Sequence, residues 1–256
     1  MKKIISAVLA LVMMLALAAC SKSGTDTEEA APAADSNTLV MATSADFPPY
    51  EYMENDSYAG IDIEIAQAIA DKLGMALDIQ NVNFDSVLTG VSTGKYQMGM
   101  SGISVTDERK QSMDFSNPYT TAIQAVVVKS DSGLTSLDDV QAIDNFLIGV
   151  QLSTTGDIYI TDDYGSDHVT EYTTGMDAIQ ALLSNKVNAV VIDNEPAKSF
   201  VAANEGLTIL SSPYVQEDYA IALNKDNAEL NAKINTALAE LIADGTVQTI
   251  IDKYIS

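Results

Sequence analysis

A run of small polar residues precedes an arginine in the segment Met100–Arg109, which reads Met-Ser-Gly-Ile-Ser-Val-Thr-Asp-Glu-Arg. Gly102 lets the backbone approach a ligand closely, and Ser104 offers a hydroxyl and a backbone N–H. Arg109 carries a planar fork of donors that matches a carboxylate in bidentate fashion. The segment therefore predicts a carboxylate-binding site. In the alternative interpretation, Arg109 caps a surface helix and pairs with Asp107 or a neighbouring residue.

A second polar turn, Gln151–Gly156, follows an apolar run and precedes a predicted helix. Backbone N–H groups at a helix N-terminus favour an anion, although Ser153 or Thr154 can equally serve as an ordinary helix cap. Asp193 ends another apolar run, at the carboxyl end of a predicted strand, where ligands bind in open α/β sheets. The alternative for Asp193 is again a helix-capping role.

Apolar periodicity predicts the elements that position these residues. Alternating strands and helices are expected at Thr38–Thr43, Gly60–Gly74, Met75–Val82, Phe84–Thr93 and Tyr96–Met100. This order indicates an α/β fold with a parallel sheet. A second α/β unit follows, with strands at Phe146–Val150, Val169–Tyr172, Ala189–Asp193 and Leu207–Leu210.

Two β-rich runs, Ala122–Lys129 and Tyr219–Leu223, are long enough to carry the chain between two lobes and back. They predict a hinge near Val126–Asp131 and Glu217–Ala222. The last two amphipathic segments, Glu229–Ala243 and Thr246–Tyr254, are expected to be helices that close the first lobe.

The first twenty residues have the features of a bacterial export signal. Two lysines precede the apolar run Ile4–Ala18, and Leu17-Ala18-Ala19-Cys20 resembles a lipoprotein cleavage box. We expect residues 1–19 to be a signal peptide, Cys20 to carry lipid such as palmitate, and residues 20–37 to be a flexible tether. The protein would then be extracytoplasmic, anchored at the outer face of the cell membrane or in the periplasm. The alternative is an ordinary signal peptide with a cysteine near its cleavage site.

Composition excludes some partners. The chain has 256 residues, of which 36 are acidic and 13 basic, for a formal charge of -23. Such a field repels phosphate backbones, so nucleic acid is not expected as a partner. Cys20 is the single cysteine, which excludes an internal disulfide and thiol catalysis. No cofactor and no metal are expected.

Three motifs are those of a known family. They are Gly60-Ile61-Asp62-Ile63-Glu64-Ile65, the segment Gly102–Arg109, and Asp114-Phe115-Ser116-Asn117-Pro118-Tyr119. Over Thr38–Ile255 the chain resembles the polar amino-acid-binding proteins of bacterial ABC transporters, solute-binding family 3. The resemblance implies a two-lobed α/β clamp of the periplasmic-binding-protein type II, each lobe a mixed sheet flanked by helices, joined by a two-strand hinge. Lobe 1 would comprise residues 38–127 and 220–256, and lobe 2 residues 128–219.

The resemblance also implies the binding residues. Arg109, with Ser104 and Thr154, would hold the α-carboxylate of an amino acid, and Asp193, with backbone near Gly102, its α-ammonium. Phe47 and Phe84 would line the side-chain pocket, and Ser44 and Gln151 stand where identity varies with ligand. The full predicted set is Ser44, Phe47, Phe84, Ser101, Gly102, Ser104, Arg109, Gln151, Thr154, Thr155 and Asp193.

These features predict the monomeric substrate-binding lipoprotein of an ABC importer, which delivers a free amino acid to permease subunits and has no catalytic residues. Ser44 stands where many relatives have aspartate, and Ser153 where glycine is commoner. The predicted side-chain pocket, which includes Ile192, holds no carboxylate, and burying a cation there would cost much free energy. A neutral polar ligand is therefore expected.

Two other functions stay open. Some relatives with this fold are dehydratases of cyclohexadienyl acids, where a positioned proton donor helps a hydroxyl to leave. Little in the sequence favours that chemistry, since the single histidine, His168, is expected to be exposed on the surface. A sensor that reports the ligand to a membrane receptor is the other alternative.

Overall fold

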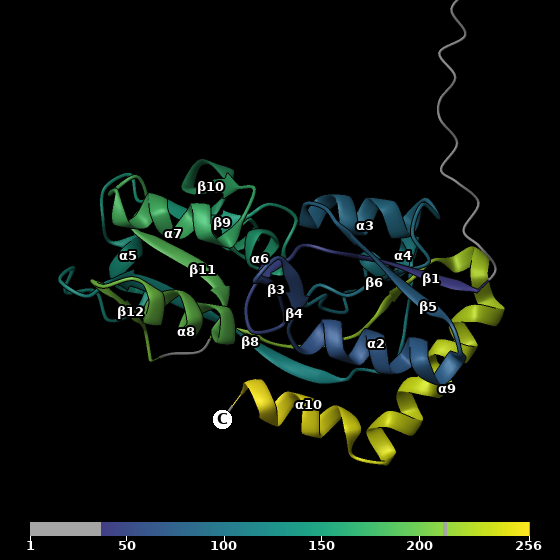
Figure 1. Cartoon of the computed structure of the whole chain (residues 1–256). Coiled ribbons are helices and arrows are strands. Elements are labelled where there is room, and N and C mark those ends of the chain that lie inside the picture. Colours follow the sequence, from purple (N-terminus) through teal and green to yellow (C-terminus); the bar gives the residue numbers. More distant parts are fainter. Residues whose placement is uncertain (1–36, 212–213, 256) are drawn as a thin grey trace, which may run out of the picture. The chain divides into compact units, whose positions relative to one another are not determined.

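The computed structural model describes residues 37–211 and 214–255, which form two α/β lobes (Figure 1). The predicted signal peptide, Cys20 and the tether up to residue 36 lie outside the described residues. No helix in the described part is both long and apolar enough to cross a bilayer.

The sheet of the first lobe has the strand order β5-β1-β6-β14-β7. Its strands are β1 (Thr38–Thr43), β5 (Ala76–Asn81), β6 (Met98–Gly99), β14 (Ala222–Leu223) and β7 (Asp114–Phe115). β1 is parallel to β5 and β6, whereas β14 is antiparallel to β6 and β7. The helices α2 (Ile61–Leu73) and α3 (Phe84–Ser92) lie on opposite sides of this sheet (Figure 1), which confirms the predicted alternation of strands and helices.

The helix α2 shows why these residues pack as they do. Ile61, Ile65 and Ile69 recur at helical spacing and are fully buried, and each such side chain stabilises the fold by about 1.5–3 kcal/mol. The helix ends at Gly74, whose φ of 67° closes it with N–H bonds to the last carbonyls. Its buried face therefore follows directly from the sequence pattern.

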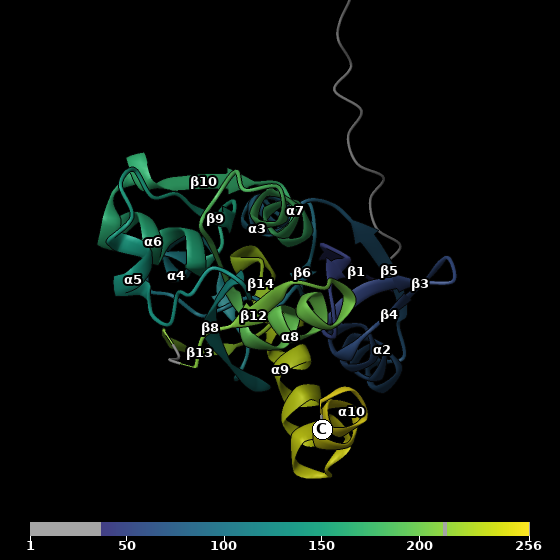
Figure 2. The same ribbon diagram turned by 90° about the vertical axis from the view of Figure 1, so that its left-hand side faces the viewer.

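The C-terminal helices α9 (Ala228–Ala243) and α10 (Thr246–Tyr254) pack on α2, as predicted (Figure 2). The side chains of Lys253 and Tyr254 both contact Glu64 on α2, each with a nitrogen or oxygen 2.5 Å from its carboxylate. The chain thus returns to complete the first lobe.

A three-stranded antiparallel sheet of β2 (Asp46–Phe47), β3 (Glu51–Glu54) and β4 (Ser57–Ala59) was not predicted. It lies between β1 and α2 in the chain. Its short strands lack the length that makes an alternating pattern recognisable. This sheet is important because it carries two acidic side chains of the site described below.

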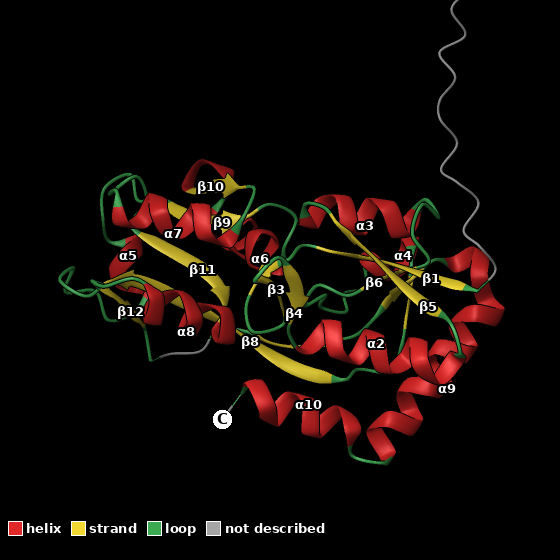
Figure 3. Ribbon diagram, in the orientation of Figure 1, coloured by secondary structure: helices red, strands yellow, loops and turns green. Residues whose placement is uncertain are grey.

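The second lobe has a sheet of order β10-β9-β11-β8-β12, with β13 also paired to β8. Its strands are β8 (Thr120–Lys129), β9 (Ile148–Gln151), β10 (Val169–Tyr172), β11 (Ala189–Asp193), β12 (Leu207–Ile209) and β13 (Gln216–Tyr219). Its helices are α5 (Leu137–Gln141), α6 (Thr155–Tyr164), α7 (Gly175–Leu183) and α8 (Asn194–Ala203). Helices flank the strands of both lobes, as Figure 3 shows.

The two crossing segments pair with each other. Residues 120–123 of β8 are antiparallel to residues 216–219 of β13, so two strands connect the lobes. The predicted first crossing, Val126–Asp131, is displaced: Val126 and Val127 pair with β11 inside the second sheet. An uninterrupted apolar run does not reveal where a long strand leaves one sheet for another. The residue limits assigned to the two lobes stay a prediction.

Candidate functional site

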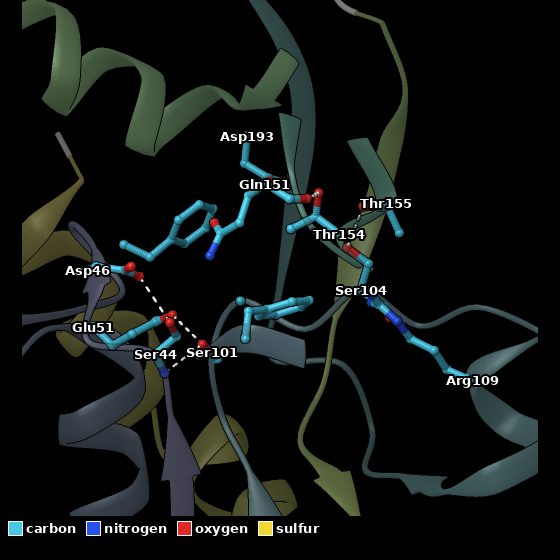
Figure 4. Close-up of a pocket in the computed structure, with 13 residues that line it drawn as sticks. Ser44, Asp46, Glu51, Ser101, Ser104, Arg109, Gln151, Thr154, Thr155 and Asp193 are labelled. Carbon is cyan, nitrogen blue, oxygen red and sulfur yellow. Dashed lines mark hydrogen bonds between the residues drawn. The ribbon is translucent and has the colours of Figure 1, made fainter. Parts of the chain in front are cut away.

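Thirteen residues from both lobes line a pocket with about 300 Å³ of empty space (Figure 4). Every predicted binding residue lines it, and two unpredicted acids join them. The lining residues are Ser44, Asp46, Phe47, Glu51, Phe84, Ser101, Gly102, Ser104, Arg109, Gln151, Thr154, Thr155 and Asp193.

Arg109 opens the short helix α4 (Arg109–Ser112) and is only 6% exposed. Its Nη1 donates to the Ser104 carbonyl at 2.7 Å, and its Nη2 donates to the Ser153 carbonyl at 3.0 Å. The guanidinium lies 5.5 Å from the centre of the Phe84 ring. Burial lowers the pKa of Arg109.

No acidic side chain in the described ranges forms an ion pair with Arg109. Asp107, the partner in the alternative interpretation, pairs with Lys110 at 3.3 Å. That alternative is therefore wrong. A buried cation held only by carbonyls retains donors and charge for an anion, because buried charges are normally paired.

The start of α6 lies opposite Arg109, on the second lobe. Thr154 is the N-cap: its Oγ1 accepts from Asp157 N at 3.3 Å and donates to the Gln151 carbonyl at 2.7 Å. Its hydroxyl is thus already engaged. The predicted capping interpretation is confirmed, and it leaves the backbone N–H groups of Thr155 and Gly156 as the anion donors of this helix end.

Ser153 adopts a φ of 65°, a left-handed conformation that favours glycine. Its backbone N–H donates to Asp157 Oδ2 at 2.9 Å, and its carbonyl accepts from Arg109. Ser153 therefore adopts a backbone path that glycine would adopt without strain. The turn stays suited to holding Arg109 in place.

Asp193 occupies the N-cap position of α8, yet its side chain makes no capping bond. The carboxylate is 7% exposed and its Oδ1 has no hydrogen-bond partner among the described residues. Burial, followed by the charge of Glu217, raises the pKa of Asp193 to about 7. A buried carboxylate that lines a pocket and has one oxygen without a donor favours a cationic group such as an ammonium.

Gly102 lies between the two lobes and has a φ of 52°. A Cβ at this position would lie 3.0 Å from the Tyr219 ring and 3.1 Å from the Phe47 ring, so only glycine fits without displacement. Its N–H donates to Asp62 Oδ2 at 2.9 Å, and Tyr119 OH donates to Asp62 Oδ1 at 2.7 Å. The hydrogen bond from the Gly102 N–H to Asp62 thus fixes the turn at Gly102. Burial raises the pKa of Asp62 to about 6.

Two carboxylates that the sequence analysis missed lie at the other end of the pocket. Glu51 is fully buried, and its Oε1 accepts from Ser101 Oγ at 2.7 Å. Asp46 Oδ1 accepts from Ser44 Oγ at 3.1 Å, and Ser44 N donates to Ser101 Oγ (Figure 4). Burial raises the pKa of Asp46 to about 6 and that of Glu51 well above its usual range. The expectation of a pocket without a carboxylate is therefore wrong.

Two further expectations need correction. Ile192 was placed in the pocket but packs on α7, where a Cβ on Gly175 would lie 2.6 Å from its Cδ1. His168 was expected to be exposed, but it is partly buried and stacks on Phe146 with ring centres 3.9 Å apart. It does not line the pocket.

Among the described residues, Arg109 has no acidic ion-pair partner and Asp193 Oδ1 has no hydrogen-bond partner, and both side chains line one pocket between two α/β lobes. This arrangement suits a small zwitterion. Fold and site together define a two-lobed solute-binding protein. The chain belongs to the bacterial extracellular solute-binding proteins, family 3, whose sequence model matches residues 39–256.

Individual relatives are similar over most of their length. The arginine-binding extracellular protein ArtP of Bacillus subtilis (strain 168) is 32% identical over 266 residues, covering 100% of this chain and 99% of that protein. The probable histidine-binding protein of Neisseria gonorrhoeae is 30% identical over 263 residues, covering 100% and 96%. The solved structure of an ancestral arginine-binding protein bound to glutamine is 36% identical with a TM-score of 0.80, covering 86% of this chain and 98% of that one.

Proposed function

We propose that this protein captures a free L-amino acid between its lobes and delivers it to the permease of an ABC importer. One observation carries the proposal: the buried Arg109 and the buried Asp193 line the same small pocket, and within the described part of the chain Arg109 has no acidic ion-pair partner and Asp193 Oδ1 no hydrogen-bond donor. Arg109 and the N–H groups of α6 would bind the α-carboxylate, and Asp193 the α-ammonium.

The side chain of the ligand would lie toward Glu51 and Asp46. The sequence analysis expected a neutral polar ligand because the predicted side-chain pocket held no carboxylate. Since Glu51 and Asp46 line the pocket, that reason no longer applies. Both groups accept hydrogen bonds, so we propose that a cationic side chain such as that of arginine binds most tightly. A neutral side chain with an amide, such as that of glutamine, would bind more weakly. The names of the relatives, which include arginine-binding proteins, support this order.

The export signal, the lipid on Cys20 and the monomeric state belong to the same proposal. They rest on the residues 1–37 of the sequence and on the extracellular role of the family. Mass spectrometry of the mature protein tests the anchor: a lipidated N-terminal Cys20 is expected, and an unmodified N-terminus contradicts it. Loss of arginine uptake on deletion of the gene is expected for delivery to a permease; unchanged uptake with a lost chemotactic or transcriptional response to arginine supports a sensor instead.

A thermal-shift screen of the twenty amino acids tests ligand binding directly. A ligand at a hundred times its dissociation constant adds about 2.7 kcal/mol of stability, which raises the Tm of a protein of this size by roughly 5–10 °C. Arginine is expected to give the largest shift. If no amino acid stabilises the protein, the proposed function is wrong.

A dehydratase is the second candidate, and one observation favours it. Burial raises the pKa of Glu51 well above its usual range, which leaves a proton donor in the pocket. Incubation with prephenate, followed by ultraviolet absorbance of an aromatic product, distinguishes the two functions. Product formation that the Glu51→Gln variant lacks would establish the enzyme, and absence of product with a thermal shift for arginine would establish the binding protein.

A further inference from the structure

The ionisable side chains around Glu51 in the described part of the chain are acids and phenols. Glu51 is fully buried on β3, and no lysine or arginine of the described ranges pairs with it. Arg109 is bound to backbone carbonyls at the far end. The ionisable groups that act on Glu51 or lie against it are Asp62 on α2, Asp46 on β2, Asp193 at the end of β11, Tyr50 and Tyr119.

Glu51 and Asp62 differ in how well their charges are satisfied. Asp62 accepts hydrogen bonds on both oxygens, from the Gly102 N–H at 2.9 Å and from Tyr119 OH at 2.7 Å. Glu51 accepts a single bond, from Ser101, and its buried Oε2 has no partner among the described residues.

A second ionised carboxylate beside Asp62 in a buried site costs much free energy. Two close carboxylates therefore commonly ionise only once, and one of them keeps its proton. The group with fewer donors keeps that proton. Burial and the charge of Asp62 accordingly raise the pKa of Glu51 well above its usual range, whereas that of Asp62 rises only to about 6.

We propose that Glu51 holds a proton in the ligand-free protein and exchanges it for a cationic ligand side chain. The inference rests on the proposed function, in which the side chain of a bound amino acid lies against Glu51. When a guanidinium or ammonium group enters, the Glu51 O–H bond breaks, the carboxylate pairs with the cation, and the proton leaves to solvent. When a neutral side chain enters, Glu51 keeps its proton, and its O–H donates a hydrogen bond to the amide or ureido oxygen.

Arginine and citrulline provide a matched pair of probes, because citrulline replaces the guanidinium by a neutral ureido group of nearly the same shape. Both carry the same α-ammonium, so any proton that Asp193 releases on binding is common to the two. The difference between them therefore reports the side-chain end. Exchange predicts about one more proton released per arginine than per citrulline at pH 7.

Titration calorimetry of the full-length protein at pH 7, in phosphate and in Tris, gives the number of protons from the dependence of the heat on the buffer. We expect more protons released with arginine than with citrulline in the wild type and in the exposed Glu205→Gln, and loss of this difference in Glu51→Gln. Equal counts for arginine and citrulline, or binding of citrulline alone, overturn the exchange while amino-acid binding stands. If only arginine binds, the number of protons that its binding releases is compared between the wild type and Glu51→Gln. Equal numbers in the two proteins overturn the exchange. The comparison of arginine with citrulline uses the wild-type protein alone, so it does not depend on whether a variant folds. Absence of binding of both probes overturns this inference, whereas the proposed function is decided separately by the thermal-shift screen of the twenty amino acids.

Discussion

Glu217 Oε2 accepts a 2.8 Å hydrogen bond from the hydroxyl of Thr155, which joins a hinge strand to the first residue of α6. Gln124 Nε2 donates to the same oxygen at 2.9 Å, and Tyr159 OH donates to Oε1 at 3.0 Å. The strand of Glu217 continues to Tyr219, which forms a β-bridge with Ser104. One hinge strand thus holds α6 on one side and the Ser104 turn on the other.

Glu217→Gln should weaken amino-acid binding by roughly ten-fold or more, because a hydrogen bond to a buried charge contributes about 1.5–3 kcal/mol. The α-carboxylate end is common to all ligands, so arginine and glutamine should lose affinity by the same factor. Titration calorimetry checks this, with the exposed Glu205→Gln as the matched control. Unchanged affinity, or a loss confined to one ligand, contradicts the positioning role of Glu217.

Arg109→Met should abolish useful binding of every amino acid. Removing one partner of a buried charge pair costs about 2–5 kcal/mol, or tens-fold to several-thousand-fold in affinity. The exposed Lys95→Met serves as control and should bind as the wild type does, because Lys95 lies over the Tyr96 ring and does not line the pocket. Calorimetry that finds wild-type affinity in Arg109→Met would show that the carboxylate site is assigned wrongly.

Local sequence patterns place the predicted binding residues, whereas a tertiary contact places the acid Glu51 that the sequence analysis missed. Asp193 is the last residue of an apolar strand, and Arg109 opens a helix after a polar turn, so local sequence patterns place both at the ends of elements. Glu51 stands on a four-residue strand, and Ser101, fifty residues further along, supplies its hydrogen bond. Local patterns carry no signal for such a tertiary contact.

Strand geometry explains the error at Ile192. Successive side chains of a strand point to opposite faces, so an Asp193 that lines the pocket places Ile192 on the other face, against α7. The sequence alone therefore contained the information to exclude Ile192. Asp46 is different, because an acid in a turn after a strand is commonly solvated, and its burial depends on how the two lobes enclose the pocket.

The free energy of unfolding of the ligand-free protein should fall as the pH rises from about 4 to 7. Burial raises the pKa of Asp193 to about 7, whereas an unfolded aspartate titrates near 4. Between these values the folded state binds more protons than the unfolded state, so stability is present at low pH and lost as the pH rises. Asp193→Asn should flatten this decline by up to a few kcal/mol.

Urea unfolding of the ligand-free protein at several pH values between 4.5 and 8 measures this decline. Asp167→Asn, at an exposed position, is the control and should keep the wild-type pH dependence. The same slope in the wild type and in Asp193→Asn would mean that Asp193 is not buried as a proton-binding group.

Ligand binding should draw the lobes together. Arg109 and Glu51 belong to the first lobe, whereas Asp193 and the start of α6 belong to the second, so neither lobe alone offers both ends of the site. Only a closed arrangement lets both lobes contact one amino acid, and two-strand hinges permit such closure. Small-angle scattering should therefore give a smaller radius of gyration with saturating arginine than without it. Arg109→Met should keep the ligand-free radius at the same arginine concentration. A wild-type radius that does not change with bound arginine would mean that the pocket is already closed before the ligand enters.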